Sequence, residues 1–401
     1  MEGVIPMKKL FLLMAAIFMA FTLGALDDAQ AGTDLGGVQI HGFISQGFLY
    51  TDTYNYLAND TKDGSFEYNE MGINFGKQLN DKLRIGMQLF SRDLGDAANN
   101  KVTVDWAYAD YRWQDYLGLR AGRIKLPIGF YNETRDMDML RTSIVLPQGI
   151  YNDLLRDNMI AANGVSLYGN VGLKAAGSLE YQLLAGVTQA DVDNGVGKYT
   201  NSGLAPLGGT LDGDIKSDTS YAGALRWETP LKGLRVGYSI INSPFIQVPV
   251  RFGAMPLEID ASRNVQIYSA EYTWRDLIVA AEYMIRKDES TIMGLTTSTT
   301  AESYYLSAAY RFVDWFTLGA YYSEFYPNKD HKDGDNLAIA NNAWEKDLAL
   351  TLRFDINDYW IFKIEGHAVN GTANVLCSDN PGNDFADSQW YYGAAKLSFS
   401  F

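Results

Sequence analysis

The charged residues best suited to chemistry gather between Lys125 and Asn163. Arginines and carboxylates are interspersed there among many apolar side chains. Charges of both signs either pair to hold a loop in place or face each other across a narrow watery passage, where their field selects ions. The sequence leaves both roles open for each residue. The candidates for such a passage are Arg120, which precedes the stretch, and Glu133, Arg135, Asp136, Asp138, Arg141, Asp153 and Arg156.

The sequence contains no recognisable catalytic motif. Its only histidines are His41, His331 and His367, no two of them have metal-ligand spacing, and no Gly-x-Ser-x-Gly motif is present. The single cysteine, Cys377, excludes an intrachain disulfide. The net charge of −15 argues against nucleic acid as a partner. We therefore expect no enzyme, no cofactor and no bound metal.

The end of the chain shows what kind of element carries the charges. In residues 390–401, Leu397, Phe399 and Phe401 share one apolar face, whereas Lys396 and Ser398 fall on the opposite one. This period of two predicts a strand between lipid and water. For this segment alone, the edge strand of a soluble sheet is the alternative.

Fifteen further segments carry the same alternation. They lie near residues 38–50, 66–76, 83–89, 102–111, 116–124, 164–169, 178–187, 221–229, 234–241, 265–274, 277–286, 303–312, 315–323, 348–356 and 360–369. A slip of one residue would turn charges toward lipid, so the register is well specified. The sequence predicts an all-β fold, a transmembrane antiparallel up-and-down β-barrel of sixteen strands that closes on itself.

The connections between these segments alternate in length. Short ones occur near 78–81, 113–116, 170–177, 230–233, 275–276, 313–314 and 357–358, and the others are mostly long and rich in Asp, Asn, Gly and Thr. Aromatic residues predict a girdle at each end of the barrel. The short-turn set is Trp113, Tyr116, Trp227, Trp274, Trp315, Tyr359 and Trp360, and the long-loop set is Tyr221, Tyr304, Trp344 and Trp390.

The amino end predicts export. Lys8 and Lys9 precede an apolar run over residues 10–25, and Ala29-Gln30-Ala31 supplies small residues for cleavage. An uncleaved anchor is the alternative, but the run is shorter than the ~20 residues of a spanning helix. We expect residues 1–31 to be a signal peptide that is removed, and residues 32–401 to form a single barrel domain.

The whole pattern resembles the Gram-negative outer-membrane porin superfamily. A narrower likeness to phosphate-selective-porin-like proteins rests on Gly122-Arg-Ile-Lys-Leu-Pro-Ile-Gly129 and the residues that follow it. The superfamily resemblance implies a sixteen-stranded homotrimer in the outer membrane, in contact with lipid and lipopolysaccharide. It also implies that the third long loop, about Lys125–Asn163, folds into the barrel. Apolar residues such as Leu126, Ile128 and Ile150 would then pack on an inner wall.

The resemblance also implies a channel for small hydrophilic solutes and ions. The alternatives are a substrate-selective channel, such as one for anions or phosphate, and a barrel that sheathes a partner protein. Residues with the inward phase are expected to line the pore. They are Arg84, Glu180, Arg226, Arg235, Glu271, Glu282, Arg353, Lys363 and Lys396. Arg123 and Lys125 have the outward phase, which predicts the rim or a subunit contact unless a bulge intervenes.

Overall fold

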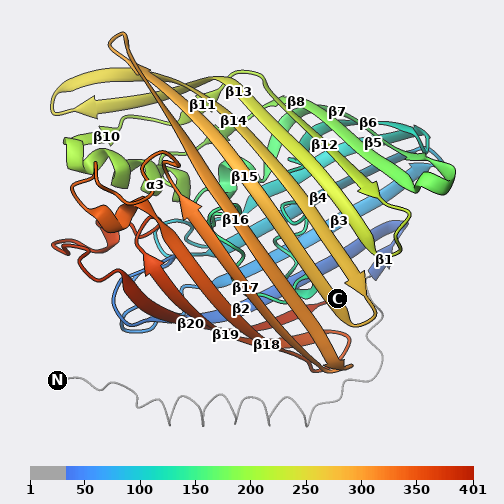
Figure 1. Ribbon diagram of the computed structural model, residues 1–401. Coiled ribbons are helices and arrows are strands. Elements are labelled where there is room, and N and C mark those ends of the chain that lie inside the picture. Colours follow the sequence, from blue (N-terminus) through green and yellow to red (C-terminus); the bar gives the residue numbers. More distant parts are fainter. Residues whose placement is uncertain (1–32) are drawn as a thin grey trace.

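The computed structural model describes residues 33–401, which form a closed antiparallel barrel of sixteen strands (Figure 1). The predicted signal peptide, residues 1–31, lies outside the described residues. The barrel strands are β2 (Val38–Thr51), β3 (Asn69–Asn80), β4 (Leu83–Asp93), β5 (Thr103–Gln114), β6 (Leu117–Lys125), β7 (Ala161–Gly172), β8 (Ser178–Val187), β12 (Ser220–Glu228), β13 (Leu234–Phe252), β14 (Met255–Trp274), β15 (Leu277–Ile292), β16 (Leu295–Val313), β17 (Phe316–Tyr326), β18 (Glu345–Asp355), β19 (Trp360–Gly371) and β20 (Gln389–Ser400).

The ring closes where the first barrel strand meets the last. β2 pairs with β20 from Phe43 opposite Ser400 to Thr51 opposite Tyr392. The backbones of Gly42 and Phe401 extend this ladder by exchanging two hydrogen bonds, of 3.1 and 3.0 Å. Because lipid offers backbone groups no hydrogen-bond partner, this closure is what permits a sheet to span a membrane. The predicted fold class and strand number are confirmed.

The predicted alternation of faces is confirmed along the strands. In β20 the side chains of Lys396 and Ser398 are buried inside the barrel, whereas Tyr391 is 58% exposed on the outside. In β8 the same contrast separates buried Gln182 from its exposed neighbour Leu183. The outer surface is therefore apolar and the inner surface polar, as a lipid-facing barrel requires.

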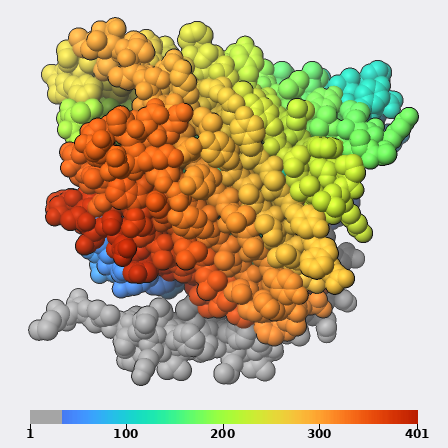
Figure 2. All heavy atoms as spheres, in the orientation of Figure 1, coloured from blue at the N-terminus to red at the C-terminus, as the bar shows by residue number. Residues whose placement is uncertain are grey.

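Four strands are longer than the alternation predicts. β13, β14, β15 and β16 continue well past the predicted segments into two hairpins, which stand above the neighbouring loops (Figures 1 and 2). The extension of β16 is rich in Ser and Thr, at residues 296–300, and such a run lacks the apolar alternation by which the membrane-spanning parts were recognised. The hairpin of β13 and β14 carries exposed apolar side chains such as Phe245 and Met255 instead.

Short elements outside the barrel strands were not predicted. β1 (Thr33–Leu35) folds back on β2 through Gly36 and Gly37, which have φ of 62° and 77° and thus suit a tight hairpin turn. The long connection from β8 to β12 contains α3 (Gly195–Leu204) and the short strands β9 (Gln189–Ala190), β10 (Gly209–Leu211) and β11 (Ile215–Ser217). β10 and β11 pair with the extension of β13.

The aromatic residues at the short-turn end face outward, as predicted. Trp113, Tyr116, Trp274 and Trp315 are all exposed there. Trp390 corrects the prediction for the long-loop end, because it is fully buried and its indole N–H donates to the Gly371 carbonyl over 2.9 Å. Its position has the inward phase of Tyr392, so its ring packs inside the barrel.

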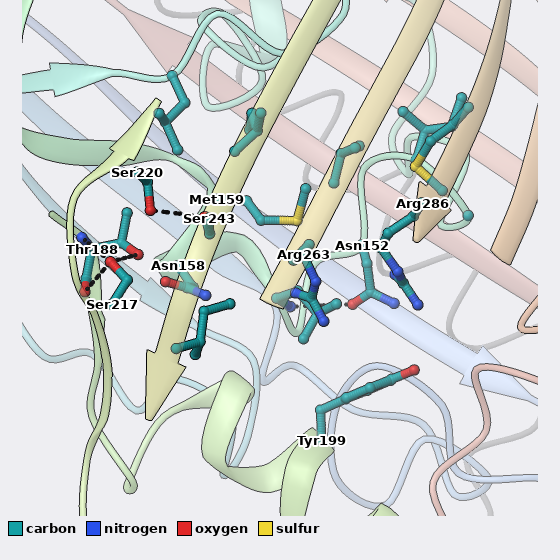
Figure 3. A pocket seen from close by; sticks show the side chains of 18 of the residues that line it. Asn152, Asn158, Met159, Thr188, Tyr199, Ser217, Ser220, Ser243, Arg263 and Arg286 are labelled. Atoms are coloured by element: carbon teal, nitrogen blue, oxygen red, sulfur yellow. Dashed lines mark hydrogen bonds between the residues drawn. The ribbon is translucent and has the colours of Figure 1, made fainter. Parts of the chain in front are cut away.

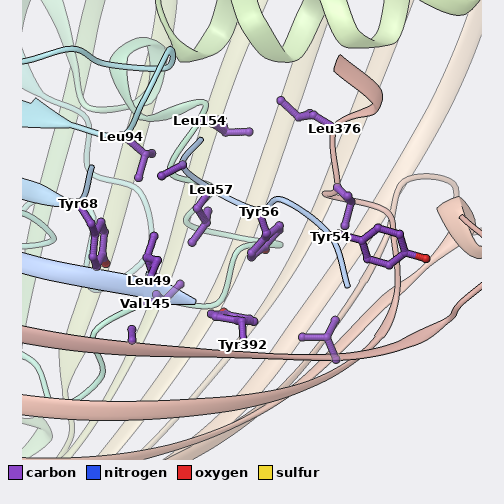
Figure 4. Packing of buried hydrophobic residues seen from close by; sticks show 14 of the residues in the cluster. Leu49, Tyr54, Tyr56, Leu57, Tyr68, Leu94, Val145, Leu154, Leu376 and Tyr392 are labelled. Carbon is purple, nitrogen blue, oxygen red and sulfur yellow. The ribbon is translucent and has the colours of Figure 1, made fainter. Parts of the chain in front are cut away.

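Much of the barrel interior is filled by side chains from distant segments. One buried cluster joins Leu49 of β2, Tyr56 of the first long loop, Val145 between β6 and β7, and Leu376 between β19 and β20 (Figure 4). A second cluster joins Leu126, Ile128 and Ile150 to the inner faces of β13 to β16. Within residues 33–401, no helix is long and apolar enough to cross a membrane.

The two faces of β16 supply a matched test of the lipid-facing assignment. Leu306 is 58% exposed on the outside, and its neighbour Ser307 borders an internal cavity. Leu306→Arg is expected to lower the free energy of unfolding by roughly 2–4 kcal/mol, because it puts a charge into the apolar band. Ser307→Arg is expected to cost much less. Denaturant titration of the barrel folded in lipid vesicles measures both, and equal losses would contradict the assignment.

Candidate functional site: the third loop and the inner wall

The third loop, defined here as residues 126–160 between β6 and β7, is held against the inside of the barrel by Glu282 of β15. This buried carboxylate accepts a hydrogen bond from the Phe130 backbone N–H over 2.8 Å and from the Tyr151 hydroxyl over 2.5 Å. Ser269 and Tyr305 of the wall donate to the same group over 2.6 and 2.9 Å. Glu282 was predicted to line the pore, and the structure places it beneath the loop instead.

A second wall carboxylate holds the loop about fifteen residues further along. The backbone N–H groups of Ile144 and Val145 each donate to Glu365 of β19 over 2.8 Å. His367 lies 3.0 Å from the same carboxylate. Two backbone donors on one buried carboxylate make a charge-assisted anchor, a strong class of hydrogen bond. The loop is thus fixed to β15 and to β19, on different parts of the ring.

Basic residues of the wall hold the carbonyl groups of the same loop. The Lys363 ammonium donates to the carbonyls of Asp138 and Arg141 over 2.7 and 2.8 Å. Arg353 donates to the carbonyls of Met139 and Arg141 over 2.9 and 3.0 Å. Lys363 and Arg353 were predicted to line the pore, and both instead cap the loop backbone.

Four charges form a buried cluster where the loop leaves β6. Arg156 lies 2.5 Å from a carboxylate oxygen of Asp136 and 2.7 Å from one of Asp105. Lys125 lies 2.9 and 3.7 Å from the same two carboxylates. Two positive and two negative charges balance, so the cluster carries no net charge. Removing one partner from such a set leaves an uncompensated buried charge.

Lys125 corrects its predicted outward position. The regular alternation of β6 is interrupted at Gly122, whose φ of 136° suits only glycine. Beyond that point Ile124 and Lys125 are both buried. Arg123 is partly exposed, its Nε donates to the Asp105 carbonyl over 3.0 Å, and it borders a cavity together with Lys101 and Asp191 of the long connections.

The pKa of the Asp136 carboxyl reflects this pairing. Burial raises its pKa, but the charges of Arg156 and Lys125 outweigh burial and hold it well below the ordinary 3.8. Because the pKa of this carboxyl is lower in the folded state than in the unfolded chain, its ion pairs stabilise the fold when the pH is above the ordinary pKa. This stabilisation is lost as the pH falls through the folded-state pKa. The ion pairs of Asp136 therefore persist at neutral pH, and their contribution is lost only in strong acid.

Other predicted passage charges are also paired. Arg135 is buried and lies 2.7 Å from Asp153. Asp138 lies 3.0 Å from the Lys363 ammonium and accepts from the Ser398 hydroxyl over 2.7 Å. Arg141 donates to the Ile144 carbonyl over 3.0 Å, and also borders an internal cavity.

The charges that border open internal space lie mostly on the wall. Glu133, Glu180, Arg226 and Arg235 surround a cavity on the short-turn side of the loop, in which Arg226 binds both Glu133 and Glu180. Arg235 and Glu271, 3.0 Å apart, border a neighbouring cavity.

The remaining predicted pore residues make contacts along the wall itself. Arg120 lies over the ring of Tyr168, 4.0 Å from its centroid, and 3.1 Å from Asp110. Lys396 binds Glu70 over 2.5 Å. Arg84 is exposed near the short turns, beside Gly76.

The anchoring residues were recognised in the sequence only by phase. The inward phase of Glu282 and Glu365 is readable, but a buried anchor and a water-facing wall residue have the same phase. Tyr151 was expected only to pack on the inner wall, and Ser239 was missed altogether, although its hydroxyl accepts from the Gly129 N–H over 2.9 Å. Of the four residues in the buried cluster, only Asp105 has an inward position that could be predicted from the alternation of its strand. Within residues 33–401, no group of three or more His, Cys, Asp or Glu is arranged to hold a metal ion.

Comparison with known proteins agrees with this architecture. The family model described as Gram-negative porin matches residues 13–358. The chain belongs to the Gram-negative porin family. It is therefore a non-enzymatic channel protein of the Gram-negative outer membrane, and the expectations from the resemblance are confirmed at that level. A search of curated proteins finds no match.

Solved porin structures share the fold of this porin at low sequence identity. OmpF of Salmonella typhi, solved with daunomycin, is 15% identical, with 91% of this chain and 97% of that chain covered and a TM-score of 0.57. The anion-selective porin of Comamonas acidovorans is 13% identical, with 91% and 99% covered and a TM-score of 0.56. A trimer form of OmpT of Vibrio cholerae is 12% identical, with 93% and 100% covered and a TM-score of 0.55.

The two wall carboxylates give a direct test of the loop anchors. Glu282→Ala and Glu365→Ala are each expected to loosen the third loop, because every buried donor left without an acceptor costs about 1–3 kcal/mol. Liposome swelling with neutral sugars of increasing size should then show a larger exclusion limit than in the parent protein.

The control for this test removes a different inward carboxylate. Glu180 binds Arg226 and does not contact the third loop, so Glu180→Ala should leave the exclusion limit unchanged. An unchanged limit in both anchor variants, with the barrels folded, would show that these carboxylates do not hold the loop.

Proposed function

We propose that the third loop sets the size limit of this diffusion channel. The observation that carries the proposal is the set of anchors from Glu282, Glu365 and Lys363, which hold one loop to separate parts of the inner wall. A segment held in this way occupies the middle of the lumen and leaves solutes only the space beside it. The buried charges of the loop form ion pairs that balance one another, and these pairs stabilise the conformation of the loop.

The proposal divides the predicted passage charges into two groups. Arg135, Asp136, Asp138 and Arg156 are buried in ion pairs and support the loop. Ion preference is instead set by charges beside open space, of which Arg141, Arg226 and Arg235 are the basic members and Glu133, Glu180 and Glu271 the acidic ones. Arg120 is assigned to the second group as a partly exposed wall charge, which contacts Asp110, Tyr108 and Tyr168 and no residue of the third loop.

Ion preference tests this division. Arg120→Gln together with Arg235→Gln should shift the zero-current potential toward cation preference, since every ion passes these charges in a confined space. The control is Asp330→Asn, Asp333→Asn and Asp335→Asn, which removes exposed charges of an outer loop. Those charges are screened within about 8 Å at physiological salt. If the outer-loop set controls the potential and the arginine pair does not, selectivity lies elsewhere.

A barrel that sheathes a partner protein is disfavoured by the filled interior. Residues of the third loop pack on the wall in two clusters, and both clusters occupy space that a threaded partner needs. Passage of small solutes requires only the cavities that remain.

We further propose that the porin is a homotrimer. Closed cyclic assemblies are usual for homo-oligomers, and one solved relative is described as a trimer form. The outward face of this barrel offers the small side chains of Ala121 and Ala281 for close approach between barrels.

Two measurements test the trimer. Chemical crosslinking in native outer membranes should give a band at three times the monomer mass, and light scattering in mild detergent should give the same ratio. A monomer by both measurements would refute the trimer and leave the channel function standing.

A further inference from the structure

A cavity on the long-loop side of the third loop contains two arginines with unused hydrogen-bonding capacity. Arg263 of β14 and Arg286 of β15 line it together with Asn152 and Asn158 of the third loop and Tyr199 of α3 (Figure 3). Within residues 33–401, no other charged side chain lines this cavity. It is separate from the predicted passage charges, and Arg263 was not recognised in the sequence because it lies in the unpredicted extension of β14.

Both arginines share a single carboxylate. The Nε of Arg263 lies 2.6 Å from one oxygen of Asp288, and the Nε of Arg286 lies 2.8 Å from the other. Among the described residues, none accepts a hydrogen bond from the terminal nitrogens of either guanidinium. Two positive charges against one negative leave a local excess of one. The pair is therefore held in position by Asp288, with its terminal N–H groups available to an anion.

One part of the cavity wall is apolar, whereas Thr188, Ser217 and Ser220 supply polar groups elsewhere in the lining. Ile241, Val265 and Met284 of the wall are buried in the cluster that also contains Leu126 and Ile150 of the third loop. Phe325 of β17 closes another side. Figure 3 shows Arg263 and Arg286 on either side of Asn152, with the ring of Tyr199 nearby. Charged donors over an apolar floor suit a ligand with an anionic head and an apolar body.

We propose that this cavity binds a small organic monocarboxylate with an apolar body. A carboxylate matches the planar donor geometry of guanidinium groups, and one negative charge matches the local excess. Inorganic phosphate would meet the arginines but would leave the apolar floor without a partner. Because Gln148 and Ile150 line the cavity, the bound molecule rests on the third loop and obstructs ion flow.

This inference rests on the channel function but is tested apart from it. Benzoate is the probe, and titration calorimetry on the detergent-solubilised porin measures its binding whether or not ions pass. Benzoate should bind more tightly than benzamide, acetate or inorganic phosphate. In planar bilayers, benzoate added on the long-loop side should then reduce the single-channel current.

Matched variants locate the site. Arg263→Gln with Arg286→Gln should weaken benzoate binding about tenfold or more, because charge-assisted hydrogen bonds are lost. Lys287→Gln is the control, since Lys287 is the next residue of β15, exposed, and pairs with Glu289 over 2.7 Å. It should bind benzoate as the parent does. Circular dichroism and the current without benzoate confirm that each barrel is folded.

Several results would overturn the proposal. These are equal binding by the arginine pair variant and the parent, tighter binding of phosphate than of benzoate, or equal binding of acetate and benzoate. The last would show that the apolar floor contributes nothing. Binding of benzoate without any reduction of current would leave the site in place and refute its position beside the ion path. Absence of any conduction would instead refute the channel, independently of the calorimetry.

Discussion

The closed ladder between β2 and β20 is the constraint on which the rest of the structure depends. A sheet in lipid cannot leave backbone N–H and C=O groups unpaired at an edge, so the first and last strands must meet. Their pairing from Phe43 to Thr51 fixes a ring with one apolar and one polar face. Closure also creates an inner surface with no contact with lipid, and every charge with the inward phase then has to find water or a partner. The interior chemistry follows from that requirement.

The third loop meets this requirement by pairing with buried charges of the wall. Glu282 and Glu365 would be costly if left alone, because burying an unpaired carboxylate is strongly unfavourable. Backbone N–H groups of the loop satisfy both, at Phe130 and at Ile144 and Val145. The same hydrogen bonds satisfy loop backbone that would otherwise be buried without partners. Wall and loop thus depend on each other, and this reciprocity fixes the position of a long connection that carries little regular secondary structure.

The sequence predicted the strands of the barrel better than the roles of the side chains inside it. Alternation such as Leu348, Leu350 and Leu352 against Thr351 and Arg353 is local, so all sixteen strands could be located from it. Whether an inward residue faces water or lies under a loop depends on chain folded from far away. Glu282 and Glu180 have the same phase, yet one is an anchor and the other borders a cavity. Trp390 was misplaced for a related reason, since an aromatic near a strand end was weighted above its own inward phase.

The extended strands β13 to β16 show how the same backbone rules serve a different purpose beyond the membrane. Once the strands leave the apolar band, their outward faces no longer need apolar residues, and in β16 Ser and Thr replace them. Their inward faces can still build a site, as Arg263 and Arg286 do with Asp288. Asp288 orients both guanidinium groups through Nε and cancels only one of their two charges. A channel entrance with a positioned but incompletely neutralised arginine pair can therefore favour one class of solute while the barrel below remains a general path.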